Sequence, residues 1–167
     1  MNVLRSLNRF FYKIEFGLLV VFLGSMVLLA FAQVVLRNVF GTGLVWADTI
    51  VRHLVLWAGF VGAALATSDE RHISIDALTK FLSARKKHVV MIFTSAFAVV
   101  ACYYLGSAAW EYVVDEQMHG GDLVLSIPTW VALLIIPAGY YLIAFHFFIK
   151  VIENAVAALG KQSGAPK

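Results

Sequence analysis

Charged side chains are scarce in this sequence and absent from the middle of its apolar stretches. Only 14% of the 167 residues are charged, whereas 61% are hydrophobic. A soluble domain normally carries about a quarter charged residues, so the composition excludes an ordinary water-soluble fold. The mean hydropathy of +0.84 agrees. We therefore expect helix packing in lipid to stabilise the chain.

Cysteines and catalytic motifs are equally scarce. The single cysteine, Cys102, cannot form a disulfide within the chain, which excludes a disulfide-exchange relay. No set of His, Cys and carboxylate residues has zinc-site spacing, and no phosphate-binding loop, nucleophile elbow or metalloprotease helix is present. We expect no catalytic residue, no metal and no cofactor, and hence a protein that is not an enzyme.

The sequence contains instead four long apolar runs. About 20 apolar residues in a helix cross the hydrocarbon core of a bilayer. Lys13 and Glu15 mark one end of the first run, and 41–43 should form a turn. We predict an all-α integral membrane protein, one four-helix domain over 1–155 followed by a disordered tail at 156–167. The four transmembrane helices are expected at about 15–37, 46–68, 88–112 and 127–150.

Smaller features refine this prediction. Apolar residues recur at helical spacing within 74–84, which favours a short interfacial helix in the loop between the second and third spans; a solvated loop is the alternative. Pro128 suits the first turn of the fourth helix. Pro137 should kink that helix, and Gly139 should give a neighbouring helix room.

Lys and Arg are distributed unevenly around the spans. Eleven lie in the two terminal flanks and the central loop, and only Arg37 and Arg52 lie in the other hydrophilic regions. Because basic loops stay in the cytoplasm, we expect both termini and the central loop to be cytoplasmic. Ala30-Phe31-Ala32 is similar to a signal-peptidase site, but the apolar run continues past it, so we expect no cleavage.

Polar residues gather at the outer ends of the first two spans. Asp48 and Arg52 are one helical turn apart and can form an ion pair. They could pair within their helix, with Arg52 reaching toward the interface, or contact another subunit. Gln33 and Arg37 are also one turn apart, and either join this cluster or act independently.

Small residues and tryptophans suggest packing surfaces on the second span. Gly59 and Gly62 each precede an Ala by four residues, a spacing that lets another helix approach closely, either from this chain or from a partner. Trp46 belongs to the interfacial aromatic belt. Trp57 lies deeper, where its indole N–H requires an acceptor.

Histidines raise one enzymatic alternative, the haem-b anchor of a respiratory complex. Such an anchor needs two histidines at one depth on different helices. His88 and His146 both lie on the inner side and could meet this condition, whereas His53 lies near the outer face. Interfacial or capping roles are the alternative. A further rival is a small exporter that works as an oligomer of this chain alone.

An ordered set of residues carries a family resemblance. It comprises Arg37-x-x-Phe40, Trp46-x-Asp48, Arg52, Trp57, Gly62-Ala63, His72-Ile73-x-x-Asp76, Ile127-Pro128-x-Trp130 and Pro137-x-Gly139. With this set the chain resembles the small membrane subunit of tripartite ATP-independent periplasmic (TRAP) transporters, the DctQ-like family. Thr49 stands where the family often has a second acid after the Trp, so no paired-carboxylate feature is expected there.

The resemblance implies a non-catalytic scaffold subunit in the bacterial inner membrane. Its partners would be a large multi-helix membrane subunit, which carries the sodium and carboxylate sites, and an extracytoplasmic binding protein that delivers an organic acid such as a C4-dicarboxylate or sialic acid. Arg37, Asp48 and Arg52 would order the outer end, and His72 and Asp76 would fix the inner loop. The expected interface or structural residues are Gln33, Arg37, Trp46, Asp48, Arg52, Trp57, Gly59, Gly62, His72 and Asp76.

Overall fold

The protein is almost entirely helical where the structure describes it. The computed structural model describes the backbone of residues 2–68, 84–124 and 126–159, and the side chains of 11–44, 46–68, 88–124 and 126–156. Four helical stretches in these ranges are long and apolar enough to cross a membrane, which confirms the predicted fold class. The helices are α1 (Asn2–Phe40), α2 (Val45–Ser68), α4 (Ala84–His119), α5 (Thr129–Leu133) and α6 (Ile135–Leu159).

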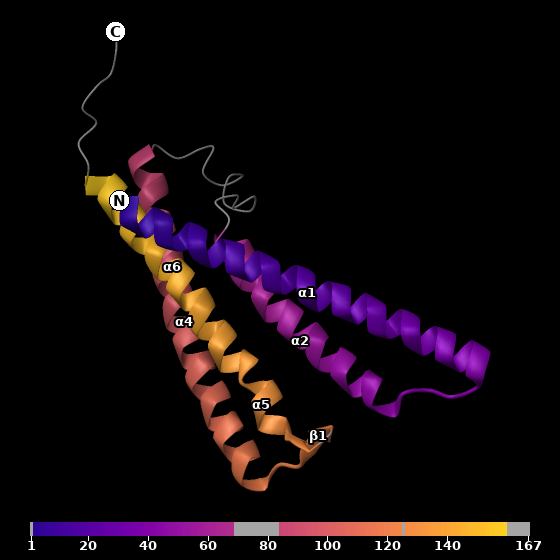
Figure 1. Ribbon diagram of the computed structural model, residues 1–167. Helices are drawn as coiled ribbons and strands as arrows, with labels where there is room; N and C mark the ends of the chain where they lie inside the picture. Colours follow the sequence, from indigo (N-terminus) through magenta and orange to yellow (C-terminus); the bar gives the residue numbers. More distant parts are fainter. Residues whose placement is uncertain (1, 69–83, 125, 160–167) are drawn as a thin grey trace.

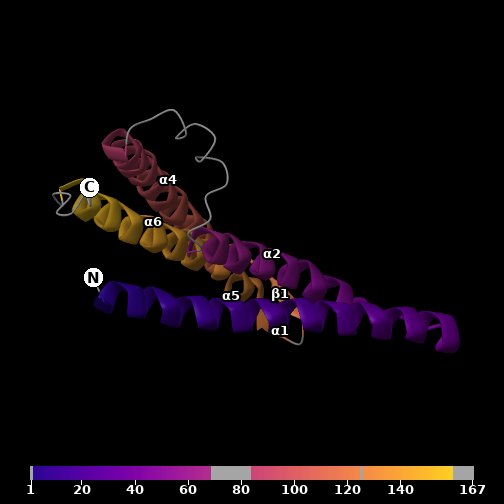
Figure 2. The ribbon, with the colours of Figure 1, turned by 90° about the horizontal axis from the view of Figure 1, so that it is seen from above.

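The helices form two pairs that diverge from a common end. α1 packs along α2, α4 packs along α6, and the pairs meet mainly through α2 and α6. Figure 1 shows the pairs close together where α1 begins and α6 ends, and well separated where α1 turns into α2 and α4 ends. Figure 2 shows from above that α6 lies between α4 and α1 toward the N-terminus. We call the first region the terminal end and the second the loop end.

Turn chemistry explains where the first two helices stop and start. α1 has no Gly or Pro between Gly24 and Gly41, and it ends at Phe40 because Gly41 adopts a φ of +65°, the left-handed region that glycine enters without strain. α2 begins at Val45, one residue from the predicted start. α1 extends beyond the predicted 15–37 at both ends. At 39 residues it is about 58 Å long, so it exceeds the hydrocarbon thickness unless it tilts or protrudes.

α4 also extends beyond its predicted 88–112, reaching His119. Its last turns are polar but contain no helix breaker until Gly120, so the apolar pattern underestimated its length. A short antiparallel hairpin follows, made of β1 (Asp122–Val124) and β2 (Ile127–Pro128). The sequence analysis did not predict this hairpin. Pro128 is therefore the residue before α5, with extended geometry, and does not occupy its first turn.

The fourth span, Thr129–Val156, is helical and is interrupted at one residue, three residues before the proline that was expected to kink it. α5 ends at Leu133, Leu134 forms a turn, and α6 starts at Ile135. Pro137 is fully buried in the first turn of α6. Because its ring blocks the carbonyl four residues earlier and its nitrogen donates no hydrogen bond, the regular helix breaks upstream of the proline.

Gly139 provides the close approach that the sequence analysis predicted. A methyl group added at Gly139 would lie 2.5 Å from Cδ1 of Phe60, so α2 occupies the space that a larger residue would need. Phe60 in turn packs edge to face against Tyr140, with ring centroids 5.1 Å apart. This contact joins the two helix pairs.

Two predicted features fall partly or wholly outside the described residues. The interfacial helix was expected at 74–84. Residues 74–83 lie outside the described ranges, and Ala84 is the first residue of α4. The tail expected to be disordered from 156 is helical through Leu159, and residues 160–167 lie outside the description.

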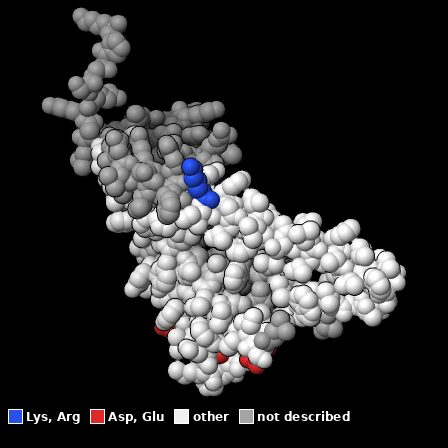
Figure 3. Space-filling view, in the orientation of Figure 1, with Lys and Arg blue, Asp and Glu red and all other residues white. Residues whose placement is uncertain are grey.

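Figure 3 shows acidic side chains at the hairpin end of the visible face and uncharged surface between them and the terminal end.

Candidate partner interface

A polar pocket lies at the loop end of the α1–α2 pair. Gln33 and Arg37 of α1 and Asp48 of α2 line the same pocket of about 520 Å³, together with the glycines of the turn. The structure thus brings three of the predicted residues together. Arg37 and Gln33 have no hydrogen bond or ion pair with any described residue. The amide of Gln33 and the guanidinium of Arg37 line this pocket together with one carboxylate, that of Asp48. The pocket can therefore bind a polar group of another molecule.

Asp48 and Arg52 form the ion pair that their spacing allows. Their carboxylate and guanidinium are 3.7 Å apart, and the two side chains are 66% and 78% exposed. An exposed pair of this length contributes about 0.2–1 kcal/mol to folding. Its contribution to folding is therefore small, and its charges are available to a partner at the membrane surface.

α2 presents one exposed face of small residues below this ion pair. The exposed positions follow one another at intervals of three or four residues, so they lie on one side of the helix. We call this the open face of α2; its members are Asp48, Arg52, Val55, Gly59, Ala63 and Ala66. A helix face of Gly and Ala permits close backbone approach in a membrane.

The two predicted small-residue positions have different surroundings. A methyl group at Gly62 would lie 3.8 Å from Leu19 of α1, whereas one at Gly59 would meet nothing within 4 Å. Gly62 therefore serves packing within the chain. Gly59 belongs to the open face, which this chain leaves uncovered.

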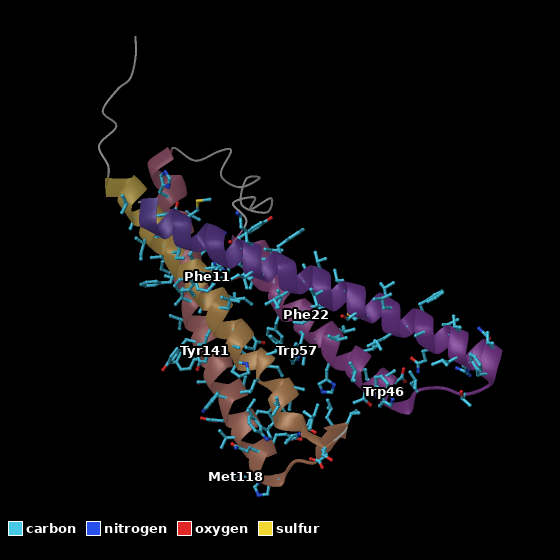
Figure 4. All side chains as sticks on the ribbon, viewed as in Figure 1. Phe11, Phe22, Trp46, Trp57, Met118 and Tyr141 are labelled. Atoms are coloured by element: carbon cyan, nitrogen blue, oxygen red, sulfur yellow. The ribbon has the colours of Figure 1, made fainter. Side chains whose placement is uncertain are left out.

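The two predicted tryptophans also differ. Trp46 is 39% exposed at the start of α2. The indole N–H of Trp57 donates to the carbonyl of Ala132 at 2.8 Å, and its ring packs edge to face on Phe22 at 5.4 Å. Figure 4 shows Trp57 on the side of α2 that faces the other helix pair, with Phe22 nearby. The indole N–H therefore has the acceptor that it was expected to need. This acceptor is a backbone carbonyl of α5, which leads into α6 of the other helix pair.

The remaining predicted residues lie outside the description. His72 and Asp76 belong to residues 69–83, so their proposed role in the inner loop stays a prediction.

A buried polar contact that no sequence pattern indicated joins α1 to α6. Glu15 was taken as the end of the first apolar run, but it lies within α1 and is 2% exposed; His146 of α6 is 1% exposed. His146 Nε2 and Glu15 Oε1 are 2.7 Å apart. A carboxyl group is therefore buried toward the terminal end, where the sequence indicated only the boundary of the first apolar run. The apolar neighbours of Glu15 gave the only available signal.

The histidine geometry does not suit a haem anchor. His88 Nδ1 donates to Asn154 Oδ1 at 2.9 Å, which sets His88 level with residue 154 of α6. His146 lies eight residues away on α6, about 12 Å along the axis, and its Nε2 is held by Glu15. The two histidines therefore lie at different depths. Within the described ranges, no group of three His, Cys, Asp or Glu residues could hold a metal.

Comparison with known proteins identifies the family. Residues 26–157 match the model of the DctQ component of tripartite ATP-independent periplasmic transporters. A TRAP transporter small permease protein of Haemophilus influenzae is 31% identical over 108 residues, 65% of this chain and 67% of that protein. The ectoine TRAP transporter small permease protein TeaB of Halomonas elongata is 24% identical over 154 residues, 92% of this chain and 80% of TeaB.

A third relative is a longer protein. The sialic acid TRAP transporter permease protein SiaT of Haemophilus influenzae is 29% identical over 77 residues, which are 44% of this chain and 12% of SiaT. At the level at which these relatives match, no solved structure matches the chain.

Four helices long and apolar enough to cross a membrane define the structural class, a helical membrane protein. The chain belongs to the DctQ family of TRAP transporter small permease subunits. It is a multi-pass protein of the inner membrane and a transporter subunit, not an enzyme.

Proposed function

We propose that this chain is the scaffold that anchors a large permease subunit in the inner membrane, within an importer of organic acids coupled to sodium and supplied by a binding protein. The observation that carries the proposal is the open face of α2, a row of small residues below an exposed ion pair. Such a face suits contact with another helix. The resemblance between a short part of SiaT and this chain is consistent with a small-subunit segment working next to a larger one.

The chain itself has little chemistry for binding a carboxylate substrate. Glu15 is the only buried Asp, Glu, Lys or Arg among the side chains that the structure describes, and a carboxyl group carries no positive charge with which to hold an acid. An anionic solute in a bilayer needs cationic or dipolar partners. The substrate and sodium sites therefore belong to the large subunit in this proposal.

The polar pocket extends the same interface to the membrane surface. Asp48 belongs both to the pocket and to the open face, so the two surfaces are continuous. We assign the loop end to the periplasmic side, because the basic segments flank the terminal end and the positive-inside rule keeps them in the cytoplasm. Arg37 and Gln33 would then contact polar groups of the large subunit near the periplasm.

The test is a matched pair of Ala→Leu substitutions. Ala63→Leu enlarges the open face of α2, whereas Ala96→Leu makes the same change at an exposed position of α4. Each variant is co-expressed with the large permease subunit of its transporter, and the amount of large subunit retained by the tagged chain is measured. Overpacking a contact costs about 1–3 kcal/mol, so Ala63→Leu should lower retention about tenfold, and Ala96→Leu should leave it unchanged. Equal retention by both variants would contradict docking through α2.

A further inference from the structure

The crossing of α1 and α6 near the terminal end contains a buried pair of ionisable side chains. Glu15 and His146 are separated by 131 residues in the sequence, and Glu15 Oε1 lies 2.7 Å from His146 Nε2. Both side chains are almost completely buried. Beside them Phe11 packs edge to face on Phe145, with centroids 5.5 Å apart. Because α1 otherwise packs mainly on α2, these two contacts hold it against α6.

The second carboxyl oxygen decides the protonation state. Glu15 Oε2 is buried and has no hydrogen-bond partner. An ionised carboxylate shares its charge over both oxygens, so a bare oxygen without a donor would leave charge unsatisfied in an apolar span. In a neutral carboxylic acid, the bare oxygen is only a carbonyl acceptor, and leaving that unpaired costs much less.

We propose that Glu15 is a protonated carboxylic acid whose Oε1–H donates to Nε2 of a neutral His146, and that this neutral hydrogen bond is a latch between α1 and α6. The imidazole then carries its hydrogen on Nδ1, and the pair has no net charge. An ion pair would also have no net charge, but it would move the proton to Nε2 and place two desolvated charges within the spans.

The latch fixes the angle at which the two helix pairs diverge. It lies toward the terminal end, where the pairs converge, while the open face of α2 lies along one of the diverging pairs (Figure 1). A small rotation of α1 at the latch would therefore shift the far end of the α1–α2 pair by a larger distance. The latch concerns this chain alone. It can therefore be disproved while docking through α2 stands, and docking through α2 can be disproved while the latch stands.

Infrared spectroscopy of the full chain in lipid nanodiscs at neutral pH tests the protonation state. The wild type should show the carbonyl stretch of a protonated carboxylic acid, and Glu15→Gln should lose it. The matched control Glu111→Gln changes an exposed Glu of α4 and should leave the band unchanged. Absence of the band from the wild type, or its persistence in Glu15→Gln, would overturn the proposal.

Distance measurements between spin labels test the latch itself. Labels at Val20→Cys on α1 and Phe148→Cys on α6 use exposed positions, in a background with Cys102→Ala. The Gln amide donates to Nε2 as the acid does, so Glu15→Gln should keep the wild-type distance and melting temperature. Glu15→Ala and His146→Phe should broaden the distance and lower Tm by about 5 °C. An ionic pair predicts the opposite for Glu15→Gln, a broadened distance and a lowered Tm.

Discussion

At the scale of single residues, a few polar contacts fix how the helices are joined. Apolar side chains gain little from leaving lipid for a neighbouring helix, so hydrogen bonds and close packing specify the arrangement. Each of the three contacts found here joins different helices. They are Trp57 with Ala132, His88 with Asn154, and Glu15 with His146.

We expect Trp57→Phe to loosen the junction between the two helix pairs. The substitution removes the indole donor and leaves the carbonyl of Ala132, a buried residue, without that hydrogen bond, which should cost about 1–2 kcal/mol. Thermal unfolding of the purified chain measures the effect. Trp110→Phe is the matched control. Because Trp110 is 52% exposed, this variant should unfold at the wild-type temperature. A wild-type melting temperature for Trp57→Phe would show that the bond contributes nothing.

Arg52→Ala and Asp48→Ala should weaken assembly with the large subunit or transport, without changing which substrate is preferred. The pair is exposed, so its removal should change folding stability by less than about 1 kcal/mol. Uptake competition assays with a panel of carboxylates measure both rate and preference. A changed order of preference in either variant would mean that this chain takes part in substrate selection, and the scaffold role would be wrong.

Sequence reasoning at this scale succeeded for local pairs and failed for distant ones. Helical spacing alone predicted the pairing of Asp48 with Arg52, and depth in the span predicted that Trp57 needs an acceptor. The contact between Glu15 and His146 depends on how α1 crosses α6, which no local pattern encodes. Whether Gln33, Arg37 and the other expected interface residues contact a partner stays a prediction.

At the scale of elements, α2 has two faces with different roles. Toward the rest of the chain it offers Phe60 and Gly62, which contact α6 and α1. Away from the chain it offers Gly59 and Ala63, which are exposed. A helix that is apolar on both faces and also has exposed small residues on the outward one is suited to join two bodies in a membrane.

Gly139→Ala should separate α6 from α2. Its methyl group would lie 2.5 Å from Phe60 Cδ1 and 2.8 Å from Phe60 Cβ, so the backbone of one helix must move, at a cost of about 1–3 kcal/mol. The melting temperature of the purified chain reports this loss. Gly24→Ala is the control, because nothing lies within 4 Å of its added methyl and Ala favours helix. If both variants melted together, the close approach would not matter.

The sequence predicted the number and type of elements better than their ends. The start and end of α2 fell within one residue of the prediction, because Gly43 precedes it and charged residues follow it. α4 was underestimated because its polar last turns still favour helix. The hairpin at Asp122–Pro128 was missed because two very short strands cannot show an alternating pattern, and the break at Leu134 lies upstream of the proline that causes it.

At the scale of the whole molecule, the chain consists of two helix pairs joined at one end, with the open face of α2 on one pair. Among the side chains that the structure describes, Glu15 is the one buried carboxyl group, and no group of three His, Cys, Asp or Glu residues could hold a metal. In our proposal, the polar pocket and the open face are surfaces for another protein. The molecule as a whole suits a stationary support for a subunit that moves solute.

The most direct test of this account is uptake by the reconstituted transporter with and without this chain. The large permease subunit is placed in liposomes together with its binding protein and a sodium gradient, and the initial rate of substrate uptake is measured per copy of large subunit. We predict that omitting the small subunit abolishes most of the uptake, and that the small subunit alone transports nothing. A large subunit that transports at full rate without this chain would contradict the central claim.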